Sequence, residues 1–203
     1  NSEVVGNVGS IGNISLKIKQ KEEEFDITVG SVLVATGFEP YKPKEDEFGF
    51  GKVPNVITLP EFKQLIDHEK GKLMYNGKKV ENIAYIYCVG SRQPEGGNTY
   101  CSRYCCTATI HAAIEARKKF KDIQNYHFTR GVRSYGKQEL LYAESLQGGD
   151  IFLQSYEDDL PTVFARNNRP VVRINDILTG GKELEVEADL VVLVTGMAPR
   201  SND

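Results

Sequence analysis

The sequence predicts an α/β fold, with a small doubly wound parallel sheet plus β-hairpins. Three observations lead to this prediction. Strand-like and helix-like patterns alternate from Asn82 to Leu153, as they do in βαβ units. Two short apolar runs, within residues 31–41 and 190–200, each end in the pattern T-G-x-x-P. Each run also follows a hairpin-like pair of segments, so the same design occurs twice in the chain.

The composition is that of an ordinary globular protein. The chain has 203 residues, of which 40% are hydrophobic and 26% charged, with a net charge of −3. This charge gives no sign of a nucleic-acid surface. No apolar run reaches the ~18 residues that would suggest insertion into a membrane, and the N-terminus does not resemble a signal peptide. We therefore expect a cytoplasmic protein.

Because the chain starts without Met and stops abruptly at Asp203, we also expect a fragment of a longer protein.

The first domain segment is predicted over residues 1–45. Apolar and polar residues alternate over 14–18 and again over 25–29, with a charged turn between them, which predicts a hairpin. Residues 32–35 are continuously apolar, which favours a strand covered on both faces of a parallel sheet. The run ends at Thr36-Gly37, and Pro40 disfavours a helix directly after it.

The rest of the chain divides into a linker over residues 46–80 and a second domain over 81–203. The linker contains one predicted short helix, at 59–68. A further helix is expected over 136–146, with Leu140, Leu141, Ala143 and Leu146 facing inward. Other predicted elements of the second domain are strands near 83–87, 123–128 and 151–153, a helix near 108–116, a hairpin of 171–174 with 184–186, and a buried strand at 190–195.

All four cysteines lie between the first strand of that second domain and the helix after it. Cys88, Cys101, Cys105 and Cys106 form the pattern C-x12-C-x3-C-C. In a βα unit the strand end and the helix start meet at one loop, so the four thiols could converge. A helix beginning near Ser102 would favour the thiolate form at its positive end. We therefore predict a metal centre, in the first place an iron–sulfur cluster.

Several other interpretations remain open from the residues alone. The thiols could be small core residues, ligands of a structural zinc ion, or a redox dithiol or vicinal disulfide. Nucleotide binding is weakened because no G-x-G-x-x-G follows the first strand. Arg130 and Arg133, after the second strand, could in principle meet a 2′-phosphate, but solvated or ion-paired roles are commoner. His68, His111 and His127 are scattered and form no catalytic pattern.

The string CVGSR…YCSRYCC, flanked by VLVATGFEPY and LVVLVTGMAP, resembles the A subunit of heterodisulfide reductase. It is also similar to the related subunit of the quinone-interacting membrane-bound oxidoreductase complex. The resemblance implies an oxidoreductase built as a partial FAD/NAD(P)-binding, thioredoxin-reductase-like two-domain arrangement. Residues 1–45 would be the C-terminal part of the FAD-binding domain. Residues 81–203 would be the second, dinucleotide-binding-like domain, which carries the four cysteines.

The same resemblance implies specific roles for residues of this chain. The four cysteines would ligate a [4Fe-4S] cluster. Ala35, Thr36 and Gly37 would lie near FAD, with Gly196 and Met197 at the corresponding closure of the second domain. The expected activity is electron transfer between FAD and iron–sulfur clusters, with no side chain acting as acid or base. Expected partners are other subunits of a redox complex and ferredoxin-like or disulfide-reducing proteins.

This sequence departs from the family pattern in lacking the N-terminal G-x-G-x-x-G for FAD and the ferredoxin-type cysteine runs. We therefore do not expect the fragment to hold FAD by itself. The alternative from another class is a structural zinc module that docks partner subunits.

Overall fold

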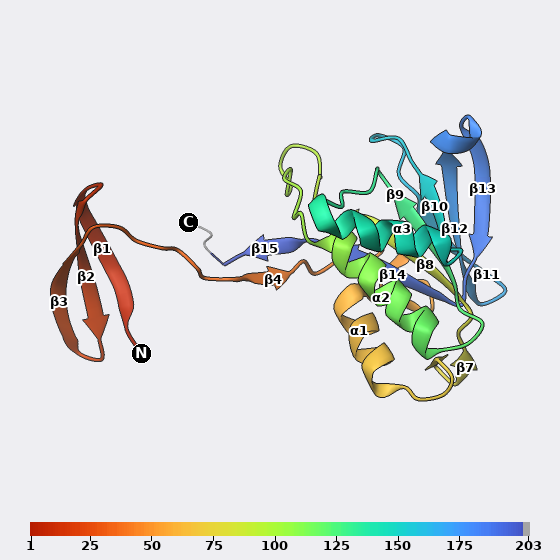
Figure 1. Cartoon of the computed structure of the whole chain (residues 1–203), viewed down its shortest axis with the longest axis horizontal. Helices are drawn as coiled ribbons and strands as arrows, with labels where there is room; N and C mark the ends of the chain where they lie inside the picture. The colour runs from red at the N-terminus through yellow and green to blue at the C-terminus, as the bar shows by residue number, and fades with distance from the viewer. Residues whose placement is uncertain (201–203) are drawn as a thin grey trace. The chain divides into compact units, whose positions relative to one another are not determined.

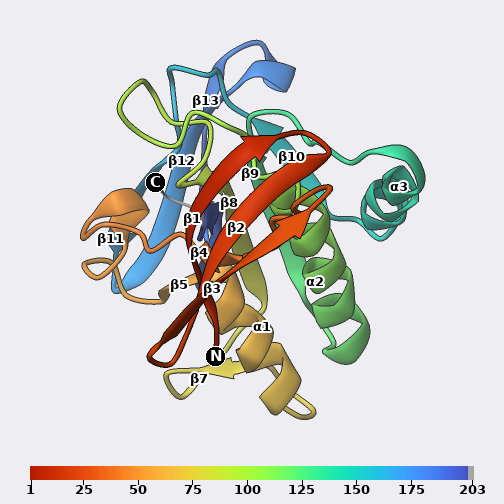
Figure 2. The same cartoon turned by 90° about the vertical axis from the view of Figure 1, so that its left-hand side faces the viewer.

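The computed structural model describes residues 1–200. They form two compact units, which we call the N-terminal unit (Asn1–Gly37 with Arg200) and the main unit (Phe38–Pro199). The N-terminal unit is a three-stranded antiparallel sheet of β1 (Glu3–Ser10), β2 (Asn13–Gln20) and β3 (Glu23–Val29) (Figure 2). The predicted hairpin is confirmed, since Leu16 pairs with Ile27 and Ile18 with Phe25.

The strand predicted at residues 32–35 is wrong. These residues have no regular structure, and Leu33 is 91% exposed. Only β4 (Phe38–Pro40) follows, and it pairs antiparallel with β15 (Met197–Pro199). An apolar run becomes a buried strand only where neighbouring strands accept its backbone hydrogen bonds and other layers cover it. Within residues 1–200, no strand pairs with residues 32–35.

The main unit is built on a five-stranded parallel sheet with the strand order β10-β9-β8-β14-β5 (Figure 1). The chain runs outward from β8 through β9 to β10, and then returns to add β14 on the other side of β8. The predicted α/β class with a parallel sheet and hairpins is confirmed. The strands are β5 (Val56–Thr58), β8 (Asn82–Val89), β9 (Gln124–Thr129), β10 (Ile151–Gln154) and β14 (Leu190–Thr195).

Two different layers cover the two faces of this sheet. On one face, side chains of α1 (Leu59–His68) and α2 (Cys105–Lys119) pack against alternate residues of β8 and β14, such as Tyr85 and Val192. On the other face, a second sheet of β11 (Thr162–Arg166), β12 (Arg169–Asp176) and β13 (Lys182–Glu187) packs against residues such as Ala84 and Leu193. Both faces of β14 are therefore buried, in contrast to residues 32–35.

The helices predicted at 59–68 and 136–146 differ in how well the sequence pattern predicted their buried face. The prediction of α1 is confirmed, and its start is capped by the Glu61 carboxylate, which accepts a hydrogen bond of 2.6 Å from the Thr58 backbone N–H. Most of the inward face predicted for the helix at 136–146 is wrong: in α3 (Glu139–Gln147) Leu140 is 73% and Leu146 46% exposed, Ala143 is exposed as well, and only Leu141 is half-buried. The inward contacts come instead from Ser145, which is buried, and from Tyr142, which lies edge-on to Phe152.

The remaining elements are short and connect the larger ones. They are β6 (Met74–Tyr75), β7 (Lys78–Lys79), and the 3-10 helices η1 (Glu47–Gly49), η2 (Gly136–Gln138) and η3 (Ile177–Thr179).

No helix within residues 1–200 is long and apolar enough to cross a membrane.

Phe62 links α1 to the sheet and gives a direct test of this packing. Its ring is fully buried and meets Tyr85 edge-on at 5.6 Å. We expect Phe62→Ala to lower the free energy of unfolding by about 3–5 kcal/mol, because the cavity left behind adds to the lost transfer energy. Leu140→Ala on α3 is the control, with an expected change of no more than about 0.5 kcal/mol. Urea unfolding measures both, and equal effects would contradict the assigned core.

Candidate metal centre

Cys88 occupies an unusual backbone position at the end of β8. Its φ is +63°, in the left-handed region, and its side chain is buried. A non-glycine residue in this conformation costs about 1–2 kcal/mol, and such strain is typical of functional sites. The register between β8 and β14 shifts here, between Leu193 and Thr195. Gly90 turns the chain next, at φ +71°, and a Cβ there would lie 2.0 Å from the Tyr41 ring.

Cys105 and Cys106 are the first two residues of α2. The predicted helix start near Ser102 is therefore too early, and the reason is local. Arg103 has a φ of +55°, a conformation that breaks a right-handed helix. Cys105 and Cys106 thus lie at the positive end of the helix dipole, where free backbone N–H groups favour negative charge. Cys101 lies outside the helix and needs another support.

That support is the backbone of Met197, directly after β14. The Met197 N–H donates to Ser102 Oγ at 2.9 Å, and Tyr100 Oη donates to the Met197 carbonyl at 2.9 Å. The two residues flanking Cys101 are therefore both held by Met197. Gly196 makes the close approach possible, because a Cβ there would lie 2.9 Å from Ser102 Oγ and 3.0 Å from the Gly90 carbonyl oxygen. The predicted site residues Gly196 and Met197 thus hold the cysteine loop.

The four thiols are free and interact electrostatically. A hydrogen bond with Cys105 lowers the pKa of Cys106 to about 7, against the opposing effect of burial. The same hydrogen bond, followed by burial, raises the pKa of Cys105, and the charges of Cys88 and Cys101 raise it further. The pKa of Cys88 is raised by burial, while Arg130 and Arg92 act against this shift. The other three cysteines therefore all act electrostatically on Cys105.

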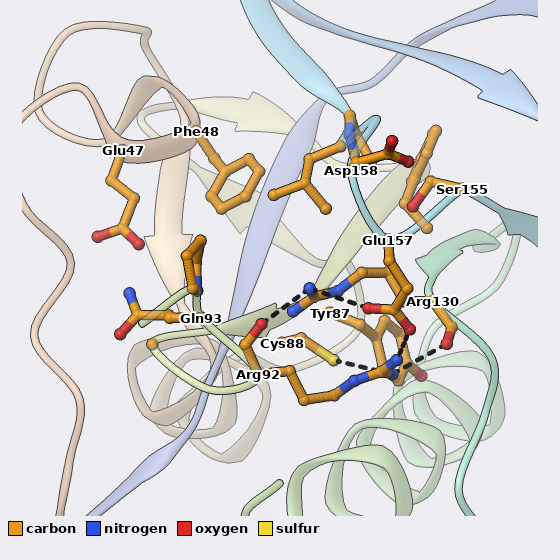
Figure 3. Close-up of a pocket in the computed structure, with 15 residues that line it drawn as sticks. Glu47, Phe48, Tyr87, Cys88, Arg92, Gln93, Arg130, Ser155, Glu157 and Asp158 are labelled. Carbon is orange, nitrogen blue, oxygen red and sulfur yellow. Dashed lines mark hydrogen bonds and ion pairs between the residues drawn. The ribbon is translucent and has the colours of Figure 1, made fainter. Parts of the chain in front are cut away.

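Positive charge surrounds these thiols. Arg133 interacts with the Cys101 thiol, and this contact raises the pKa of the guanidinium. Nη1 of Arg92 lies 4.0 Å from Cys88 Sγ. Arg92 and Arg130 also line a cavity of about 580 Å³ with Cys88 at the carboxyl ends of the parallel strands (Figure 3). Arg130 and Arg133, considered for a 2′-phosphate from the sequence, thus face the thiols.

The other predicted residues, Ala35, Thr36 and Gly37, are in the N-terminal unit. All three are exposed and outside any strand. Gly196 and Met197 are in the main unit, where they line a second cavity, of about 720 Å³. The predicted position of Ala35–Gly37 near a flavin therefore stays a prediction.

Sequence reasoning missed a buried polar network behind the thiols. Tyr87 Oη lies 3.0 Å from Nδ1 of His127, and the His127 ring is stacked between Tyr85 and Phe152. Nε2 of His127 lies 3.8 Å from Asp150 Oδ2. Burial lowers the pKa of His127, so its ring is neutral at pH 7. The sequence signal of this cluster is a pair of tyrosines two positions apart on one strand, Tyr85 and Tyr87, with His127 on the next strand.

The comparisons with known proteins identify relatives of the chain. No family model matches it. A CoB–CoM heterodisulfide reductase iron–sulfur subunit from Methanopyrus kandleri is 35% identical, over 90% of this chain and 29% of that protein. The A subunit of the H(2):CoB-CoM heterodisulfide,ferredoxin reductase from Methanothermobacter marburgensis is 33% identical, over 91% of this chain and 29% of that protein.

Among solved structures, thioredoxin reductase from T. acidophilum is similar over 98% of this chain and 54% of that chain, with 16% identity and a TM-score of 0.47.

The sequence relatives are subunits of oxidoreductases, and this is the class to which the chain is related. Within that class, the chain is homologous to a segment of the heterodisulfide reductase A subunit. It spans less than a third of the length of these relatives, about 29%.

Four free thiols are the donor set that iron–sulfur clusters use, and the surrounding arginines suit an anionic group. By this chemistry the residues present fit a cluster. Within residues 1–200, no group of three or more His, Cys, Asp or Glu side chains is arranged so that it could hold a metal ion, so the fit rests on the chemistry of the donors.

Asp150 is the negatively charged residue of the buried network, and its contribution to the free energy of unfolding depends on pH. Burial disfavours its charge, but the nearby His127 ring and the hydrogen bonds from Ser145, Arg117 and Asn125 outweigh this and lower its pKa. A carboxyl group with a lowered folded-state pKa stabilises the protein above its unfolded pKa, about 3.9, and loses this contribution as the pH falls toward the folded-state value.

We therefore expect Asp150→Asn to cost about 3–5 kcal/mol at pH 7, because it leaves the Arg117 charge without its partner. The difference from the wild-type chain should narrow as the pH falls below about 4. Urea unfolding at pH 7 and at lower pH measures this. A difference that stays constant with pH would contradict the proposed role of the Asp150 charge.

Proposed function

We propose that this chain is an electron-transfer segment of a flavin- and iron–sulfur-dependent oxidoreductase, in which Cys88, Cys101, Cys105 and Cys106 hold a [4Fe-4S] cluster. The observation that supports the proposal is that four free thiols, from a strand end, a loop and a helix start, interact electrostatically with one another and with three arginines. The words "iron-sulfur" in the name of the relative from Methanopyrus kandleri support it independently.

Each part of the main unit has a role in this proposal. The strained turn at Cys88 aims one thiol from the strand end, and the start of α2 presents Cys105 and Cys106 at its positive end. The Met197 backbone holds the segment that carries Cys101. When bound, the cluster supplies one-electron exchange. No acid or base is required of the protein, so the side chains bind, orient and compensate charge.

The activity of the whole protein is also part of the proposal. We infer that electrons pass between FAD and iron–sulfur clusters, with other subunits of a redox complex and ferredoxin-like or disulfide-reducing proteins as partners, in the cytoplasm. Residues 1–45 would belong to a FAD-binding domain, with Ala35–Gly37 near the flavin. Residues 46–80 would act as the linker, and residues 81–203 would form the domain that carries the cluster.

Anaerobic reconstitution with ferrous iron and sulfide tests the cluster directly. We expect brown protein with several irons and matching sulfide per chain, and an electron paramagnetic resonance signal on reduction with dithionite. Cys101→Ser should lower the bound iron, because an alcohol is a much poorer iron ligand than a thiolate. The control is His111→Ala on the exposed side of α2, which should leave the iron content unchanged. Colourless protein with one zinc per chain would instead establish a zinc module.

A further inference from the structure

Arg92 and Arg130 form a reciprocal pair of hydrogen bonds between the loops after β8 and β9. Nη1 of Arg92 donates to the Arg130 carbonyl at 2.9 Å, and Nη1 of Arg130 donates to the Arg92 carbonyl at 3.0 Å. Nη2 of Arg130 also donates to the Ser91 carbonyl at 3.0 Å. We call this pair the arginine clasp. It fixes both guanidinium groups at the mouth of the loop that carries Cys88.

The clasp holds more positive than negative charge. The side chains of Arg92 and Arg130 are only 11% and 8% exposed, and both pair with the same carboxylate, Glu157, which is itself 64% exposed. Among the described residues, nothing accepts a hydrogen bond from Nε of Arg130. Two buried cations sharing one solvated anion are undercompensated, since buried charges are stable only when paired.

The thiol site is the nearest place for the missing negative charge. Cys88 Sγ lies 4.0 Å from Nη1 of Arg92, and Arg130 acts on the same sulfur. The other carboxylates around the cavity do not provide the compensation. Glu47 accepts hydrogen bonds from Tyr41 Oη and the Lys44 backbone at 2.9 Å each. In the part of the chain that the structure describes, Asp158 lines the cavity but forms no ion pair with either arginine of the clasp.

We propose that Arg130, supported by Arg92, raises the reduction potential of the iron–sulfur centre by placing a fixed positive charge against its Cys88 ligand. This inference rests on the proposed function. A cluster held by four thiolates is anionic, and reduction adds one further negative charge without making or breaking a bond. A buried cation therefore stabilises the reduced form more than the oxidised form. In the test, the electron comes from dithionite through soluble mediators.

The decisive experiment is a redox titration of the reconstituted chain, followed by electron paramagnetic resonance. Arg130→Gln should lower the equilibrium constant for one-electron reduction about tenfold, which corresponds to a potential lower by about 59 mV. Arg130→Lys should recover most of the wild-type value, because it keeps the charge. Arg173→Gln is the matched control, since this arginine pairs with Glu183 and Glu185 on β13, and it should not change the potential.

A second variant, Glu157→Gln, should shift the reduction potential in the opposite direction, and it leaves the buried Arg130 side chain in place. Glu157→Gln removes the carboxylate shared by the clasp, so it should raise the potential. The shift should be smaller than that of Arg130→Gln, because Glu157 is largely exposed and its charge is screened by solvent. If Arg130→Gln does not fold, Glu157→Gln decides the question: a raised potential supports the inference, and an unchanged potential overturns it.

The outcomes also separate this inference from the function on which it rests. A wild-type chain that binds no iron–sulfur cluster overturns both. A wild-type cluster whose potential is the same in Arg130→Gln and Glu157→Gln overturns the tuning role and leaves the proposed function intact. In that case the clasp would only join the two loops.

Discussion

The insertion of β14 between β8 and β5 is the constraint on which the thiol site depends. This pairing buries both faces of β14 and brings its end, at Gly196 and Met197, beside the loop that follows β8. Backbone hydrogen bonds within that loop, such as the one from the Arg92 N–H to the Tyr100 carbonyl, close its base. Met197, directly after β14, forms hydrogen bonds with Tyr100 and Ser102, the two neighbours of Cys101. The pairing of β14 in the sheet therefore also fixes the position of Cys101.

The same sequence pattern has two different outcomes in this chain. Residues 32–35 and β14 are both apolar runs that end in Thr-Gly, but only β14 has partner strands within residues 1–200. The local apolar pattern therefore predicted only that each segment could form a buried strand. The presence of partner strands decided whether the strand formed. At the start of α2, by contrast, the cause of the wrong prediction is local. There a local backbone feature, the left-handed Arg103, overrode a sequence that permitted a helix from Ser102.

The cysteines were predictable as a group because the order strand, loop, helix is a local property of the sequence. The charge of Arg92, four residues after Cys88, was predictable in the same way, but that of Arg130 was not. Arg130 lies far along the chain from Cys88 and reaches it only because β9 pairs in parallel with β8, which aligns their carboxyl ends. His127 and Asp150 likewise meet through the order of β8, β9 and β10. Such contacts depend on register between distant segments, which one sequence does not reveal.

The buried network and the clasp lie at opposite ends of the parallel strands and differ in charge balance. At the amino ends, the Asp150 carboxylate is matched by donors from Arg117, Asn125 and Ser145. At the carboxyl ends, beside Cys88, the two buried arginines of the clasp share one exposed carboxylate. Because burial lowers the pKa of His127, its neutral ring adds no positive charge to either end. The excess positive charge therefore lies beside the thiols, where the proposed cluster would supply the anion that balances it.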